Sequence, residues 1–293
     1  MKKTLHALTA LLLTLAAVFT VLAPAALADG DSRVVIGANL SEEEIASVYN
    51  MFGITRYSVP ELTVTNGEER QYLAGKVDES LIGTNAISCV YVETLEPGAG
   101  LEIHCQNISW CTVAIYENAL VTAGITDAKV IVAAPFSVSG TAALTGIYKA
   151  YESISGETLD TDAKVAAVDE LLTTSELAEA IGSADATELV NELKAILDET
   201  ALMTDEELRG EILSIAGQIG VELTEDQIQQ LITLVRQLEQ LDSAELLSRV
   251  QEVQGTVRQF GQAASNASGL FASITRFFDS IAAFFRRIFG GGA

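Results

Sequence analysis

The stretch of residues 160–260 contains no proline and no tryptophan, whereas all four prolines of the chain lie at or before Pro135. Proline removes a backbone donor and interrupts helices, so a long proline-free stretch rich in Leu, Ile, Ala, Glu and Gln favours helix. One helix face within it is marked at helical spacing by Ile228, Leu231, Val235 and Leu238. We therefore predict a helical region over residues 159–260.

Three short motifs locate helix starts. In each, a Ser or Thr is followed three residues later by Glu or Gln, so the two side chains can bond each other's backbone amides. The first residues of these capping boxes are Ser41, Thr204 and Thr224. A further helix start is predicted at Asp242.

Residues 29–158 alternate between β-rich and helical runs. Apolar runs at 34–36 and 128–134 predict strands, the second of them closed by Pro135, and residues 112–123 predict a helix stopped by Gly124. The alternation predicts a layered α/β domain with a mixed sheet. The predicted fold class of the whole chain is therefore α+β or α/β, with this domain followed by a helical bundle and a C-terminal amphipathic helix.

Two β-rich segments flank a Pro-Gly-Ala-Gly turn and predict a β-hairpin. In the expected register Tyr91 faces Cys105 and Cys89 faces Asn107. Cys89 and Cys105 are then diagonal neighbours, too far apart for relaxed disulfide geometry. Cys111 follows a strand-to-helix bend, so we predict no disulfide or at most a Cys105–Cys111 bridge.

Residues 1–28 have the three parts of a secretory signal peptide: Lys2 and Lys3, an apolar run over 8–22, and a small-x-small site ending at Ala28. The apolar run is shorter than the ~20 residues of a membrane span. We expect a mature chain of residues 29–293 that is secreted or lies on the extracellular face of the cell envelope. Its net charge would be more negative than the −23 of the full chain, which opposes binding to nucleic acid.

Few residues of the chain are suited to catalysis or metal binding. His104 is the single histidine outside the leader, and the chain has no G-x-S-x-G, phosphate-binding or dinucleotide-binding glycine motif. A zinc site would need His104 and Cys105, which point to opposite faces of a strand. We predict no catalytic residue, no cofactor and no metal site.

Six of the ten phenylalanines lie between Phe271 and Phe289. On a helix the apolar side chains of this segment occupy one face about 140° wide, with arginines on the other face. We predict a flexible linker over 261–269 and an amphipathic helix over 270–293 that contacts either a membrane interface or protein, including a second copy of the chain. The predicted contact residues are Phe271, Ile274, Phe277, Phe278, Ile281, Phe284, Phe285 and Ile288.

Four segments carry a family resemblance, in this order: Ile82–Ser88, Asn107–Trp110, Tyr116–Gly124 and Ser139–Ile147. They resemble the YpuA-like family of secreted bacterial proteins, domain of unknown function 1002, over residues 35–241. The resemblance implies a secreted or envelope protein of Gram-positive type, and it brings no catalytic residues. Read as structure, the segments predict that Ser139 or Thr141 caps a helix and that Trp110 anchors a core or an interface.

Two functions remain open. The first is a non-enzymatic envelope protein that binds a membrane surface or a protein partner. The alternative is an extracellular hydrolase that uses acidic residues on a cell-wall or peptide substrate. Two converging buried carboxylates in a cleft would favour the hydrolase.

Overall fold

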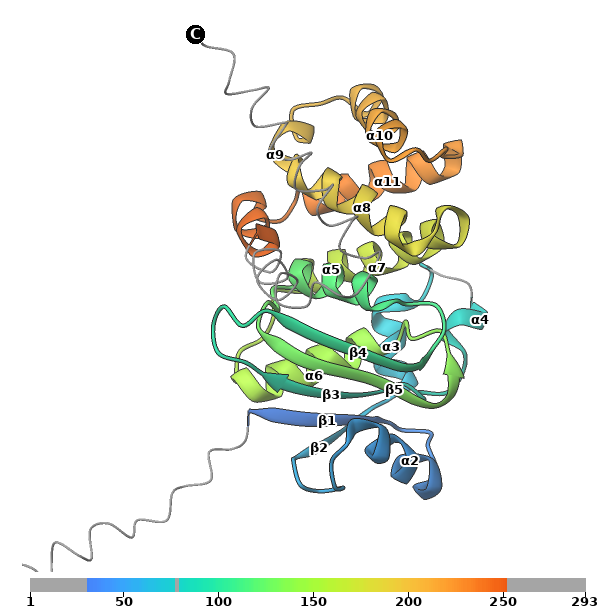
Figure 1. The fold of residues 1–293 in the computed structure, drawn as a ribbon, viewed down its shortest axis with the longest axis vertical. Coiled ribbons are helices and arrows are strands. Elements are labelled where there is room, and N and C mark those ends of the chain that lie inside the picture. Colours follow the sequence, from blue (N-terminus) through green and yellow to red (C-terminus); the bar gives the residue numbers. More distant parts are fainter. Residues whose placement is uncertain (1–30, 77–78, 252–293) are drawn as a thin grey trace, which may run out of the picture. The chain divides into compact units, whose positions relative to one another are not determined.

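The computed structural model describes residues 31–76 and 79–251 (Figure 1). The predicted leader, linker and C-terminal amphipathic helix lie outside these residues. The strands are β1 (Ser32–Gly37), β2 (Glu61–Val64), β3 (Cys89–Thr94), β4 (Leu101–Ile108) and β5 (Ala128–Val138). The helices are α2 (Glu42–Phe52), α3 (Asn66–Leu73), α4 (Glu79–Ile82), α5 (Val113–Ala123), α6 (Ala143–Ser155), α7 (Thr161–Ile181), α8 (Ser183–Ala195), α9 (Leu197–Thr200), α10 (Asp205–Ile219), α11 (Glu225–Leu238) and a last helical segment over 243–251.

The five strands form one mixed sheet in the order β2-β1-β3-β5-β4. β1 pairs with β2 and β4 with β5 in parallel, whereas β3 runs antiparallel to both β1 and β5. The mixed α+β fold class is therefore confirmed. Because only β3 is reversed, the carboxyl ends of the other four strands lie at one edge of the sheet.

Helices cover both faces of the sheet. On one face Val48 and Phe52 of α2 pack against apolar residues of β1, β3 and β5. On the other, the larger core joins Val90 and Val130 to side chains of α5, α6 and α7, such as Leu171. In Figure 1 the sheet lies between α2 and the pair α5 and α7.

The predicted hairpin is wrong. β5 lies between β3 and β4, so Cys89 faces Ala133 and Tyr91 faces Ile131. β4 exposes alternate polar side chains such as His104, whereas residues 130–134 of β5 are buried without a break. A strand buried on both faces belongs in the interior of a sheet, and a half-polar strand suits its edge. All three cysteines are free thiols.

β5 also continues through Pro135, where the sequence predicted its end. The pairing of β5 with β3 stops at Ala133. Beyond that point the β3 side of the strand makes no ladder hydrogen bonds, so the missing backbone N–H of Pro135 costs none. β4 is irregular at the same level, with Asn107 at a φ of 60° and its side chain amide donating to the Ala134 carbonyl. The two strands thereby leave the sheet together at its carboxyl edge.

The predicted capping boxes are confirmed. Ser41, Thr204 and Thr224 each accept the N3 amide of their helix, and the N3 side chain accepts the cap amide in return. Thr112 and Gly124 bound α5 as expected. The predicted cap of α6 is wrong, because its N-cap is Ala142 and makes no side-chain bond. The hydroxyls of Ser139 and Thr141 instead lie 3.3 Å from each other.

A second core lies among the helices that follow the sheet. It consists of apolar residues of α8, α10 and α11, Leu197 of α9, Ala166 and Leu177 of α7, and Val121 of α5. Leu246 and Val250 of the last helical segment also belong to it. Helices α5 and α7 contribute to both cores, so they join the sheet to the helical region.

Candidate functional site

Three of the four segments that carry the family resemblance meet at the carboxyl edge of the sheet, and the fourth, Tyr116–Gly124, forms most of α5. Asn107–Trp110 ends β4, Ser139–Ile147 follows β5, and Ile82–Ser88 leads into the reversed strand β3. The backbone amides of Trp110 and Cys111 donate to the Ser139 carbonyl at 3.3 and 3.1 Å. This edge is where sheets with parallel strands usually place their ligands.

Protein atoms fill that edge. Gly140 has a φ of 94°, and a Cβ there would lie 2.5 Å from Ile108 Cγ2 and 2.6 Å from Tyr116 Oη. The Tyr116 hydroxyl donates to the Gly140 carbonyl inside the core. Trp110, half-buried against the larger core, donates its indole N–H to Glu179 of α7 at 2.5 Å. These segments therefore act structurally, tying the sheet edge to α5 and α7.

A buried ion pair lies deeper, between α5, α7 and α8. Lys194 Nζ and Glu170 Oε1 are 2.9 Å apart, and both side chains are 0 % exposed. Lys194 also donates to the Asn118 carbonyl at 3.2 Å, and the Thr122 hydroxyl donates to the other carboxylate oxygen of Glu170. Enclosed charges are tolerated only when paired and hydrogen-bonded, as here. We call the α5–α8 part of this interface the seam.

A second acid, Glu117 of α5, is half-buried and interacts with the charge of Lys194. Burial raises the pKa of the Glu117 carboxyl to about 7, and the positive charge of Lys194 offsets only part of that rise. The side-chain amide nitrogen of Asn118 in α5 and the hydroxyl of Thr187 in α8 are each buried without a hydrogen-bond partner. The interface of α5, α7 and α8 thus contains one matched ion pair.

No sequence motif predicted this buried cluster of Glu170 and Lys194. Glu170 stands beside Val168, Leu171 and Leu172, and Lys194 follows Leu193, all of them buried. A charged residue placed on the apolar face of a helix was the available signal.

Glu69 of α3 is another enclosed acid. The residues of α3 are mostly polar, but Glu69 and Leu73 are buried. Burial raises the pKa of Glu69 to about 7. The Asn66 amide donates to one carboxyl oxygen at 3.3 Å, and the other oxygen has no partner. The helix turns this face toward the protein because Leu73 belongs to the larger core.

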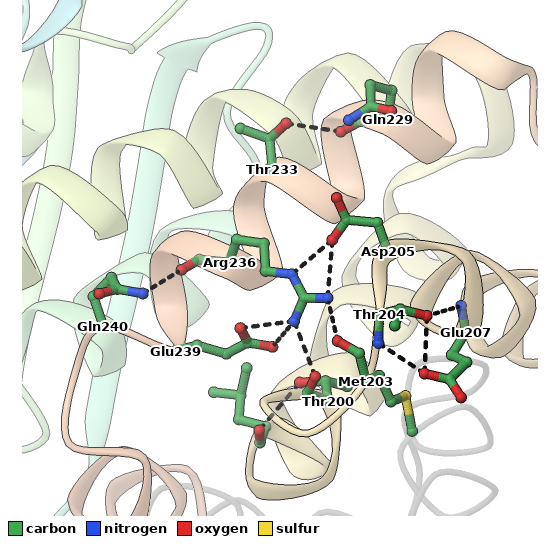
Figure 2. Close-up of polar contacts among 11 residues, drawn as sticks. Thr200, Met203, Thr204, Asp205, Glu207, Gln229, Thr233, Arg236, Glu239 and Gln240 are labelled. Carbon is green, nitrogen blue, oxygen red and sulfur yellow. Dashed lines mark hydrogen bonds and ion pairs between the residues drawn. The ribbon is translucent and has the colours of Figure 1, made fainter.

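Arg236 of α11 organises the turn between α9 and α10 (Figure 2). Its guanidinium donates to the carbonyls of Thr200 and Met203 at 2.9 and 2.7 Å, and to the carboxylates of Asp205 and Glu239 at 3.0 and 2.9 Å. One planar group thus binds the end of α9, the start of α10 and its own helix. This is a structural clamp, because every acceptor belongs to the same chain.

The sequence-predicted contact residues from Phe271 to Ile288 all lie outside the described residues. His104 is exposed on β4, 3.2 Å from Glu102. Within residues 31–76 and 79–251, no three His, Cys, Asp or Glu side chains are grouped so that they could hold a metal ion. No helix in that part of the chain is both long and apolar enough to cross a membrane.

Comparison with known proteins agrees with the resemblance. The family model described as "Protein of unknown function (DUF1002)" matches residues 36–255. A curated relative, the uncharacterized protein YpuA of Bacillus subtilis (strain 168), is 39% identical over 214 residues, which cover 73% of each chain. No solved structure matches. The chain therefore belongs to the DUF1002 family of proteins of unknown function.

Proposed function

We propose that this chain is a secreted or envelope protein that binds a membrane surface or a protein partner through its C-terminal aromatic segment. The observation that carries the proposal is the concentration of six of the ten phenylalanines between Phe271 and Phe289, in a helical pattern with arginines on the opposite face. Such a segment suits the interface of a membrane or an apolar groove on protein.

The environments of the enclosed acids favour binding over hydrolysis. Burial, the Asn66 amide and the charge of Glu68 act on Glu69, whereas burial and Lys194 act on Glu117. A hydrolase that uses two carboxyls needs them on either side of one scissile bond. Here the two acids with raised pKa have different neighbours on α3 and α5.

The large apolar side chains exposed by the described residues are dispersed along the chain. They are Tyr57, Val113, Phe136, Leu202 and Leu213, from five different loops, helices and strands. The aromatic segment offers a far denser apolar surface in 19 consecutive positions, from Phe271 to Phe289. This contrast supports the segment as the binding element.

The test is co-sedimentation of the mature chain with vesicles of phosphatidylglycerol and phosphatidylethanolamine. We compare wild type with Phe278→Glu/Phe285→Glu and with the matched control Ser273→Glu/Ser280→Glu, which adds the same charge to the polar face. Loss of sedimentation in the first variant alone supports membrane binding. If wild type does not sediment, a lower melting temperature or altered oligomeric state of the first variant alone supports protein docking. A first variant that matches wild type in all three measurements overturns the proposal.

A further inference from the structure

The seam between α5 and α8, together with α7, encloses three groups that can react with one another. Lys194 of α8 has a primary amine, Asn118 of α5 a carboxamide, and Glu170 of α7 a carboxylate. Lys194 Nζ and Glu170 Oε1 are 2.9 Å apart with both side chains 0 % exposed, and Asn118 is 9 % exposed. A nucleophile, an acceptor with a leaving group and an acid–base group are therefore held together out of water.

We propose that Lys194 and Asn118 form an isopeptide bond that joins α8 to α5, with Glu170 as the acid–base group of the reaction. The chain modifies itself, so the reaction needs no cofactor, oxidant or second protein. The proposal does not depend on the C-terminal segment.

The reaction begins with the ion pair that the structure shows. Glu170 takes one proton from the Lys194 ammonium, which leaves a neutral amine with a free electron pair. The enclosure favours this transfer compared with water, because two neutral groups cost less to bury than two charges. The amine then attacks Cγ of Asn118, and a bond forms between Nζ and Cγ.

The second half of the reaction releases ammonia from Asn118. The protonated Glu170 gives its proton to Nδ2, the bond between Cγ and Nδ2 breaks, and Glu170 takes the second proton from Nζ. The products are one amide, one molecule of ammonia and a protonated Glu170. The enclosure thereby loses both of its charges, which removes the cost of burying them.

The contacts of Asn118 place its carboxamide close to the amine. Lys194 Nζ donates to the main-chain carbonyl of Asn118 at 3.2 Å, and one methylene group joins the carboxamide to the Cα of the same residue. Changes in side-chain torsions can therefore bring Nζ to Cγ. The leaving nitrogen, Nδ2, is buried and makes no hydrogen bond to the described residues, so its departure breaks none.

Glu170 is held in the orientation that the reaction requires. The hydroxyl of Thr122, one turn after Asn118 on α5, donates to one carboxylate oxygen, and the other oxygen accepts from Lys194 Nζ. Because both charged side chains are 0 % exposed, the enclosure also protects the new amide from hydrolysis. The bond would span 76 residues of sequence and would constrain the unfolded chain as a disulfide does, without being sensitive to reduction.

The experiment is mass spectrometry of the purified, denatured protein, followed by digestion with trypsin. The wild-type mass should be lower than the mass calculated from its sequence by one molecule of ammonia. Trypsin does not cleave after an amidated lysine, so residues 77–129 and 165–209 should be recovered as one branched peptide. Lys194→Met, Asn118→Ala and Glu170→Gln should each have their full calculated mass.

Lys149→Met is the matched control, because Lys149 also pairs with a glutamate, Glu68, but the two side chains are 36 and 35 % exposed. This variant should keep the mass deficit and the branched peptide. A wild-type protein with its full mass and with cleavage after Lys194 overturns the proposal, whether or not any variant folds. A deficit that persists in Lys194→Met also overturns it, because ammonia is then lost without a bond to Lys194.

Discussion

Among single residues, Lys194 depends most clearly on its surroundings. Its side chain is 0 % exposed, and its ammonium group donates to two acceptors in other helices. Such a pair adds little net stability compared with apolar residues of similar size, but losing one partner leaves an isolated buried charge. Steric fit also makes single residues depend on their neighbours. Gly140 is required by its neighbours as well as by its backbone angle, whereas Gly53 is required by the angle alone.

We predict that Lys194→Met destabilises the protein by about 3–5 kcal/mol at pH 7, because Glu170 stays buried without its counter-ion. Urea unfolding measures the change. The double variant Lys194→Met/Glu170→Met should recover much of the loss, since both charges are then absent. A double variant that is as unstable as the single one would show that packing, and not charge, dominates the site.

Two glycines form a matched pair for the second prediction. Gly140→Ala should cost about 3 kcal/mol or more, because its Cβ would meet Ile108 and Tyr116 at 2.5 and 2.6 Å as well as straining a φ of 94°. Gly53→Ala should cost about 1 kcal/mol, since its φ is 71° but nothing lies within 4 Å. Equal melting temperatures for the two variants would contradict the close approach at Gly140.

At the scale of elements, caps and clamps decide where helices begin and end. The Ser41, Thr204 and Thr224 boxes satisfy amides at three helix starts. Arg236 satisfies backbone carbonyls at the end of α9, where it donates to the carbonyls of Thr200 and Met203 (Figure 2). The short connections of the helical region thus have side-chain bonds of their own.

Arg236→Lys tests that clamp. Lysine presents a single nitrogen and cannot bind two carbonyls and two carboxylates at once, so we expect a loss of about 1–2 kcal/mol and faster amide exchange over residues 197–205. Arg209→Lys is the control, because Arg209 makes an exposed pair with Glu225, and its loss should stay within about 1 kcal/mol. Unchanged exchange over 197–205 would show that the turn holds its shape without the guanidinium.

At the scale of the whole molecule, the titration of enclosed acids sets the response to pH. Burial raises the pKa of Glu69 and Glu117 from 4.5 to about 7, so the native chain holds protons that the unfolded chain releases between those values. Their contribution to stability is complete below pH 4.5 and is lost as pH rises through 7. Acids such as Glu44, whose pKa is lowered by the Ser41 backbone amide and hydroxyl, lose their contribution only below pH 4.5.

We therefore predict a stability maximum near pH 5 and a decline toward pH 8 of roughly 2–3 kcal/mol for each enclosed acid. Urea unfolding across this range measures it. Glu69→Gln and Glu117→Gln should each remove part of the decline, and the double variant should flatten the curve. If the wild-type chain instead became more stable between pH 5 and pH 8, the pKa values of Glu69 and Glu117 would not be raised by burial.

The sequence by itself determined the local structure, because its causes lie within a few residues. Capping boxes involve residues three apart, and the stop at Gly124 depends on a single residue with φ of 92°. Family membership was also predictable, since the four segments resemble the family residue by residue. The meeting of three of these segments at one edge of the sheet was not predicted, because it depends on the order and direction of the strands.

Only the tertiary structure decided the strand order and the enclosed charges. β5 separates β3 from β4 because burial on both faces, not proximity in the chain, selects the interior strand. Lys194 reaches Glu170 and the Asn118 carbonyl across 24 and 76 residues of sequence. Glu69 looks like an ordinary helical acid in the sequence, but the fold buries it completely, and it buries part of Glu117. The cost of burying a charge depends on everything packed around it, so no pattern within one helix contains it.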